Sequence, residues 1–529
     1  MSGKSIILVF SAHQPFLGVA EKDELGIENS YFESLSNIYL PLLRVFSNLE
    51  ADGIPFKLAL SISPQLCAKM ESRVLSEKYV EFLEKQYALA LEEQAKSEDN
   101  PEKVKLINNL IQKIIQNRRD FVETYNLKIL HKISYYAKKG NIELLGTGAG
   151  FPYMPLYSDC NEVINAHIET GLIAHRAYFG TNPTGFWLPS MGYSSGLEFP
   201  IKSYGYQYTI LETHSLLFAN PAPRQGVFST VLFPNSLTAF ARDFNSVEDI
   251  KAFMKNPVYK NCSRDIGFEL EKDRLSAFSD FSSRPVTGIG YWNNAGNLYS
   301  FEEAEAQALR DSREFIKNRK SVLDKAAGYM DKAPFCLCAM PIDILGKKWF
   351  EGALWLENLF RTVAEIEPDS GGGLSHGRDL FFSLPSEILA YSTSREKIRP
   401  LSSSWNPDGY GEELLEASNE WMYRFARNAA LKMVDLTVRF PNDSGLKERT
   451  LNLAAKEVLL SQDIVLSSMV RGRIYADYAV ETFENHITAF STVYDSLGGN
   501  SVSTEWLTEK ERCYPVFPGI NYRSFGTKK

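Results

Sequence analysis

Residues 4–10 read KSIILVF, a continuous apolar run that ends abruptly in the polar stretch SAHQPF (residues 11–16). Apolar runs of this length, bounded by turn residues, are typical of strands buried on both faces of a parallel sheet. Residues 56–62 (FKLALSI) form a second such run. We therefore expect both segments to be strands of a parallel α/β fold.

The same pattern recurs along the chain. Helical segments separate several further apolar runs, above all residues 161–179 and 302–328. Strands that alternate with helices over about 350 residues predict a parallel α/β barrel or sheet, with its chemistry at the carboxyl ends of the strands. The expected further strands are residues 141–145, 184–188, 207–211, 228–232 and 335–340.

Two regions depart from this alternation. Residues 66–138 are rich in charges and have helical periodicity, with one break at Asn100-Pro101, which predicts a helical insertion. From residue 411 onward the pattern is nearly all helical. We therefore expect a barrel-like domain over residues 1–410, including the insertion, and a C-terminal helical domain over residues 411–529.

Composition excludes several classes of function. The 529 residues carry a net charge of -8, which argues against nucleic acid or an anionic membrane as the main partner. No apolar run approaches the length of a transmembrane helix. The six cysteines are scattered without metal-ligand spacing, so we expect a reduced cytoplasmic protein with no structural metal and no cofactor. The aromatic content of 12% suits a large core or a carbohydrate cleft.

Polar side chains follow the expected strands. His13, Ser190, His214 and Asp343 each stand just beyond an apolar run, where they either satisfy backbone groups or contact a ligand. A Ser190–His214–Asp343 triad lacks the Gly-x-Ser-x-Gly elbow that would support it.

Three tryptophans are candidates for sugar contact. Trp187 and Trp349 stand in apolar surroundings that suit either a core or an aromatic cleft. Trp405 lies in the polar stretch SSSWNPDGYG (residues 402–411), where we expect a loop that presents the ring for binding.

Four stretches resemble, in order, the motifs of glycoside hydrolase family 57, especially those of its α-1,4-glucan branching enzymes and amylase-like members. These stretches are SAHQPF, AGFPYMP, GFWLPSMGY and PIDILGKKWFEG. That family carries H-x-H-x-P, T-H-G-x-L-P, G-x-W-L-P-E with a nucleophilic Glu, and D-x-E-L-F-G-H-W-W-F-E-G with an acid/base Asp. The resemblance implies a (β/α)7 barrel-like domain with a helical insertion, a C-terminal all-helical domain, and an α-glucan or oligosaccharide as partner.

The chain departs from the family pattern at the reacting positions. The nucleophilic Glu falls on Ser190 and the acid/base Asp on Pro341, while Ser11 and Phe151 replace two histidines. Retaining hydrolysis needs two carboxyl groups about 5–5.5 Å apart, and a serine hydroxyl without a base is a poor nucleophile. Proline has no side-chain proton to donate. We therefore expect no intact catalytic residue, with Asp343 as a possible substitute.

Three hypotheses follow, and the sequence leaves the oligomeric state open. The first is a catalytically impaired family 57-like protein that retains a carbohydrate-binding cleft. The second is an active α-glucan-processing enzyme, branching or hydrolytic, with relocated groups such as Asp343 and a second carboxyl group within about 10 Å. The third is a scaffold or regulatory protein whose cleft Phe151 and neighbouring aromatics close. The first assigns saccharide contacts to His13, Trp187, His214, Trp349 and Trp405.

Overall fold

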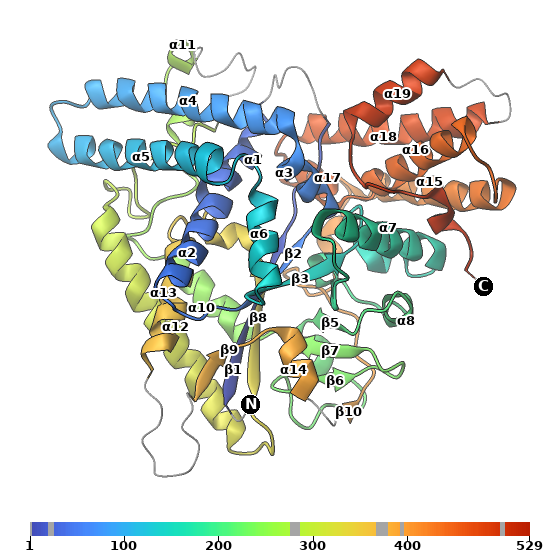
Figure 1. Ribbon diagram of the computed structural model, residues 1–529, viewed down its shortest axis with the longest axis horizontal. Coiled ribbons are helices and arrows are strands. Elements are labelled where there is room, and N and C mark those ends of the chain that lie inside the picture. The colour runs from blue at the N-terminus through green and yellow to red at the C-terminus, as the bar shows by residue number, and fades with distance from the viewer. Residues whose placement is uncertain are drawn as a thin grey trace.

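Parallel strands form the centre of the molecule (Figure 1). The computed structural model describes residues 3–18, 26–275, 286–366, 379–391, 396–497 and 503–528. A bridge between Arg242 and Leu337 joins the two ends of a run of seven parallel strands, which confirms a barrel-like (β/α)7 arrangement. The order of the run is β8 (Phe335–Pro341), β1 (Lys4–Ala12), β2 (Leu58–Ile62), β3 (Ile142–Thr147), β4 (Gly185–Trp187), β5 (Tyr208–Leu211) and β7 (Thr238–Ala241).

The apolar run that begins the chain is buried on both faces of β1. Ile7 and Val9 pack in the apolar cluster inside the barrel, whereas Ile6, Leu8 and Phe10 pack in the cluster beneath the surrounding helices. Successive side chains of a strand point to opposite faces. A strand covered on both sides must therefore be apolar throughout, which is why residues 4–10 could be recognised.

One predicted barrel strand is wrong. Residues 228–232 were expected in the barrel, but β6 (Val231–Leu232) pairs antiparallel with β7 and parallel with β10 (Glu396–Lys397). A tight turn at Ser236, whose φ is 66°, reverses the chain between β6 and β7. The barrel strand is β7 itself, a four-residue run too short to stand out in the sequence.

The helical insertion is confirmed as a set of helices between β2 and β3. α4 (Arg73–Ala95) and α5 (Pro101–Arg119) form a long hairpin that projects from the barrel (Figure 1). The side chain of Asn100 accepts the backbone N–H of Lys103, and Pro101 occupies the first turn, so the predicted break is a helix start. Two shorter helices flank the hairpin, α3 (Pro64–Glu71) and α6 (Ile129–Lys138).

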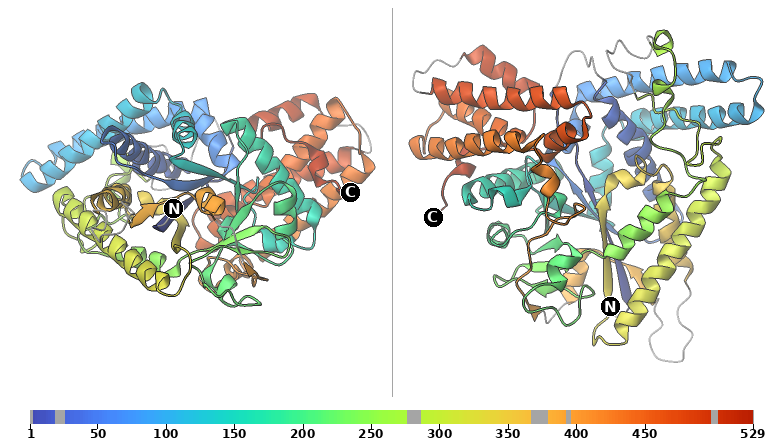
Figure 2. Two further views of the ribbon diagram at one scale, coloured as in Figure 1. Left: turned by 60° about the horizontal axis from the view of Figure 1, so that its bottom comes forward. Right: turned by 180° about the vertical axis from the view of Figure 1, so that it is seen from behind.

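The remaining helices of the barrel-like part surround the strands, except for α11 (Lys272–Leu275), which lies beside α4 (Figures 1 and 2). The others are α1 (Asn29–Ser34), α2 (Leu40–Ala51), α7 (Asn161–Phe179), α8 (Glu198–Ser203), α9 (Thr213–Leu217), α10 (Phe244–Met254), α12 (Phe301–Ala327), α13 (Gly352–Glu365) and α14 (Pro385–Tyr391). A short strand, β9 (Leu380–Phe382), pairs with the start of β1.

The C-terminal part is helical, as expected, and packs against the barrel on the side away from the α4–α5 hairpin (Figures 1 and 2). One apolar cluster runs from Phe186 and Leu188 at β4 to Leu459 and Phe525 near the end of the chain. None of the described helices has the length and apolar character needed to cross a bilayer. The helices are α15 (Glu420–Arg439), α16 (Leu446–Ser461), α17 (Ile464–Gly472), α18 (Ala476–Ser496) and α19 (Thr504–Cys513).

Candidate functional site

The parallel strand order brings the residues that follow β1 and β8 to one edge of the barrel. Ser11 lies in register with Ser61 of β2 on one side and with Pro341 of β8 on the other. Two positions that the family motifs mark, Ser11 and Pro341, are therefore direct neighbours. This edge is the barrel mouth.

Ser190 follows β4 in a left-handed turn. Its φ is 53°, and its carbonyl accepts the backbone N–H of Trp405 at 2.9 Å. The Trp405 ring packs edge-on against Trp187, with ring centroids 5.5 Å apart. The polar loop around Trp405 thus lies against the end of β4, and the ring is half-buried rather than fully presented to solvent.

His13 is enclosed by groups from three parts of the chain. Its Nδ1 is 2.8 Å from the Ser63 hydroxyl, and its Nε2 is 3.0 Å from a carboxylate oxygen of Asp463. The Phe151 ring stacks on the imidazole with centroids 3.8 Å apart. Only 4% of the His13 side chain is exposed, so both ring nitrogens and one ring face are already occupied.

Apolar side chains fill the barrel below this point. Phe151, Trp187 and Met191 belong to the same buried cluster as Ile7 and Val9 of β1. Trp405 and Ile464 pack against that cluster from the loop over β4 and from the first turn of α17. The backbone N–H of Ile464 also donates to the Phe151 carbonyl. The C-terminal helices and the barrel therefore meet directly at the mouth.

The five residues expected to contact saccharide do not form one surface. Trp187 is 0% exposed, and Trp349 is 1% exposed and packs against Tyr259 and Trp355 in the cluster beneath the outer helices. His214 lies on α9, with its ring 5.6 Å from that of Tyr410. Its Nε2 atom is buried and has no hydrogen-bond partner in the described part of the chain.

Asp343 lies in the short turn after β8, beside the segment that contains α1. Its backbone carbonyl accepts the N–H groups of Lys347 and Lys348. The Lys347 ammonium donates to the Ser30 hydroxyl of α1 at 2.5 Å. The turn therefore lies against α1.

A second carboxyl group, that of Glu33 on α1, lies near Asp343. Burial raises the pKa of Glu33; Lys347 and Lys260 oppose this rise, and Asp265 and, to a smaller extent, Asp343 add to it. Asp343 also contributes, after burial, to raising the pKa of Tyr39. Sequence reasoning missed Glu33, because α1 has six residues and carries no motif or periodicity that marks it. No group of three or more metal-ligating side chains occurs among the described residues.

Comparison with known proteins agrees with this architecture. The sequence model described as "Glycosyl hydrolase family 57" matches residues 7–287, and that described as "1,4-alpha-glucan branching enzyme, C-terminal" matches residues 426–525. A 1,4-alpha-glucan branching enzyme of Thermococcus kodakarensis is 22% identical over 486 residues, which are 86% of this chain and 68% of the relative.

Solved structures resemble the whole chain. The α-amylase AmyC from Thermotoga maritima has a TM-score of 0.88 and 28% identity, with 100% of each chain covered. The family 57-type branching enzyme from Pyrococcus horikoshii has a TM-score of 0.87 and 20% identity, covering 100% of this chain and 98% of the other. The family 57 match spans more than half of the chain, from β1 past the start of α11. This chain therefore belongs to glycoside hydrolase family 57.

Proposed function

We propose that this protein is a catalytically impaired member of family 57 that binds an α-glucan or another saccharide without cleaving it. The observation that carries the proposal is the pair of side chains after β4 and β8. Ser190 and Pro341 occupy the positions at which the family motifs carry the nucleophile and the acid/base. Neither side chain supplies a carboxyl group.

The chemistry of glycoside hydrolysis makes this loss severe. A carboxylate attacks the anomeric carbon, and a second carboxyl group protonates the leaving oxygen. General acid assistance alone contributes about 10²–10⁴-fold to such rates. The packing of Phe151 on His13 supports the proposal further, because it covers a histidine that follows β1 in the family's first motif.

Saccharide contact in this proposal falls on the loop around Trp405 and on α9. Trp405 is half-buried and Tyr410 is 60% exposed, whereas the Nε2 of His214 behind Tyr410 is buried and becomes available only if Tyr410 moves. Sugar C–H faces pack on aromatic rings, and an unpaired imidazole nitrogen accepts or donates a hydrogen bond. His13, Trp187 and Trp349 are buried in this structure and serve the packing of the frame.

The second candidate function is the active α-glucan-processing enzyme, and Glu33 is the observation that favours it. A carboxyl group with a raised pKa beside another carboxyl group is the arrangement in which one acts as acid and the other as base. This second candidate assigns the roles of acid and base to the carboxyl groups of Glu33 and Asp343.

The deciding experiment measures turnover and binding on the same preparation. Purified protein is incubated with amylose, and new reducing ends and α-1,6 branch points are counted. Glu33→Gln and Asp343→Asn are assayed beside the parent. We expect all three to stay at background; turnover that either substitution abolishes would replace this proposal with the active enzyme.

Binding is measured by calorimetry with maltoheptaose. We expect Trp405→Ala to weaken binding at least tenfold, whereas Phe425→Ala, which removes a 52% exposed ring of α15, leaves it unchanged. No binding by the parent, together with no turnover, would favour the non-catalytic scaffold with a closed cleft.

A further inference from the structure

A pocket lies among the outer helices, and Phe350 and Glu351 at the end of the stretch PIDILGKKWFEG line one of its walls. Its volume is about 610 Å³, and α2, α5, the start of α12 and α13 form its walls. Small-molecule sites usually measure about 300–1,000 Å³. These helices lie on the side of the molecule away from the C-terminal helices (Figure 1), and none of the residues at the barrel mouth lines the pocket.

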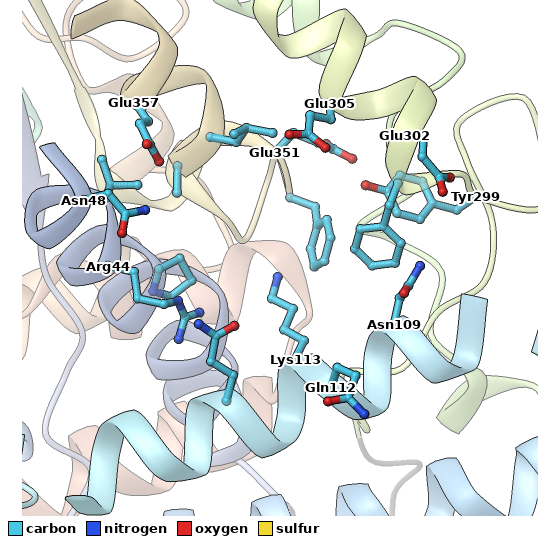
Figure 3. A pocket seen from close by; sticks show the side chains of 17 residues that line it. Arg44, Asn48, Asn109, Gln112, Lys113, Tyr299, Glu302, Glu305, Glu351 and Glu357 are labelled. Atoms are coloured by element: carbon cyan, nitrogen blue, oxygen red, sulfur yellow. The ribbon is translucent and has the colours of Figure 1, made fainter. Parts of the chain in front are cut away.

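Lys113 extends from α5 into this pocket beside an aromatic ring (Figure 3). Its Nζ is 3.6 Å from the centroid of the Phe350 ring. Within the described part of the chain no hydrogen bond or ion pair engages its amino group. The Lys260 Nζ lies 4.3 Å from the same ring centroid, so two amino groups share one ring. Burial, with a contribution from Lys260, holds the pKa of Lys113 well below its usual range.

Glu351 supplies the complementary unpaired atom. Its side chain lines the pocket, the residue is 4% exposed, and its Oε1 accepts the backbone N–H of Lys260 at 3.1 Å. Its Oε2 is buried without a hydrogen-bond partner among the described residues. Burial raises the pKa of this carboxyl group, and hydrogen bonds from the Lys260 backbone and the Tyr299 hydroxyl oppose that rise. A buried acceptor left unpaired is unfavourable, so a ligand hydroxyl that donates to it gains affinity.

The charges on the wall select against ions. Besides Lys113, the wall carries the guanidinium of Arg44, which Asp120 and Asn117 already bind. The carboxylates of Glu302, Glu305 and Glu357 on the facing helices oppose the entry of an anion. A cation would meet Lys113, which already occupies the ring position that attracts cations. Hydroxyl groups both donate and accept, so one polyhydroxylated molecule pairs with Lys113 and Glu351 together.

Side chains around these two groups suit the same ligand. The amides of Asn109 and Gln112 project beside Lys113 on α5 (Figure 3). The Phe301 ring, half-buried at the start of α12, offers an apolar surface for a sugar face. We propose that this pocket binds a neutral saccharide of one or two rings, with Lys113 as donor, Glu351 as acceptor and Phe301 as the stacking surface. The proposal goes beyond the proposed function, because it concerns a separate site.

The test is calorimetric titration of the full chain with glucose and maltose, in parallel with glucose 6-phosphate and spermidine. We expect maltose to bind, and both charged probes to bind at least tenfold more weakly. Lys113→Met should weaken maltose binding at least tenfold. Arg119→Met, on an exposed position of the same helix outside the pocket, is the matched control and should bind as the parent does.

Two further measurements keep the sites apart. Trp405→Ala, which changes the loop at the barrel mouth, should leave this binding unchanged, and thermal unfolding of each variant shows whether the fold is intact. Phe301→Ala should weaken binding without unfolding the protein. Equal maltose binding by Lys113→Met and the parent, tighter binding of either charged probe, or no binding of glucose or maltose at 50 mM (about 2 kcal/mol of binding free energy) would each overturn the proposal.

Discussion

The imidazole of His13 stacks face to face on the ring of Phe151, with centroids 3.8 Å apart and 11° between the ring planes. The two residues follow β1 and β3, and Asp463, which precedes α17, bonds the far side of the same imidazole. One stacked pair thus joins two strands of the barrel to the C-terminal helices.

Replacing Phe151 with alanine should lower the free energy of unfolding by about 3 kcal/mol, since it removes a buried ring from the apolar cluster inside the barrel. Urea denaturation measures the loss. Phe218→Ala, which truncates a ring that is 70% exposed, is the control and should change stability by less than about 0.5 kcal/mol. Equal effects of the two substitutions would contradict the packing described here.

Arg242→Met should destabilise the protein by about 3–5 kcal/mol, because it leaves Glu212 buried without its partner. The Arg242 guanidinium lies 2.6 Å from a Glu212 oxygen, and the two side chains are only 8% and 3% exposed. The double variant Arg242→Met/Glu212→Leu should recover much of this loss, which denaturant titration can measure. Arg224→Met breaks an ion pair whose arginine is 91% exposed, and we expect almost no change there.

Stability should fall as the pH drops from about 6.5 to about 4, in part because of two buried histidines. Burial lowers the pKa values of His167 and His175 to about 4. Below pH 6.5 the unfolded chain binds protons at these groups and the folded chain does not, so each histidine removes about 1.4 kcal/mol per pH unit. Above pH 6.5 neither state is protonated there, and the contribution disappears.

Substituting His175 with leucine should reduce the slope of unfolding free energy against pH by about 1.4 kcal/mol per pH unit, the contribution of one histidine. The unfolding free energy is measured at pH 4.5, 5.5 and 7. His131→Gln, at an exposed position on α6, should leave the slope unchanged. A His175→Leu slope identical to that of the parent protein would show that His175 is protonated in the folded state.

Restoring the two carboxyl groups should recover some activity on amylose. Ser190→Glu/Pro341→Asp is expected to exceed Ser190→Gln/Pro341→Asn at least tenfold in release of reducing ends, because only the first pair supplies a nucleophile and a proton donor. The matched amide pair controls for side-chain size. Equal rates for the two pairs would mean that the mouth no longer admits a glucan chain.

Much of the barrel could be predicted because buried parallel strands are apolar without interruption. β1, β2, β3 and β8 all follow this pattern, whereas the four-residue β7 is too short to stand out and the neighbouring segment around β6 resembles a barrel strand. Local pattern cannot distinguish a short barrel strand from the outer strand of a hairpin, since both are apolar. Only the pairing partners differ.

For the candidate site, too, the sequence identifies residue types but not their surroundings. Trp349 and Trp405 both looked suited to sugar contact, but Trp349 packs between Tyr259 and Trp355 while Trp405 lies against the end of β4. Glu33 does not stand out in the sequence, because the raised pKa of its carboxyl group comes from burial and from charges on distant segments such as Asp265 and Asp343. Burial and charge environment arise only when distant segments pack together.

The sequence by itself determined the strand ends, the helical insertion, the helical C-terminal part and the absence of carboxyl groups at Ser190 and Pro341. Local composition or the identity of single residues is enough to determine each of these features. The tertiary structure alone decided that Phe151 stacks on His13, that Asp463 reaches the same imidazole, and that Lys113 and Glu351 share a pocket. Contacts of this kind form between residues far apart in the chain, and they exist only once the helices have closed around the strands.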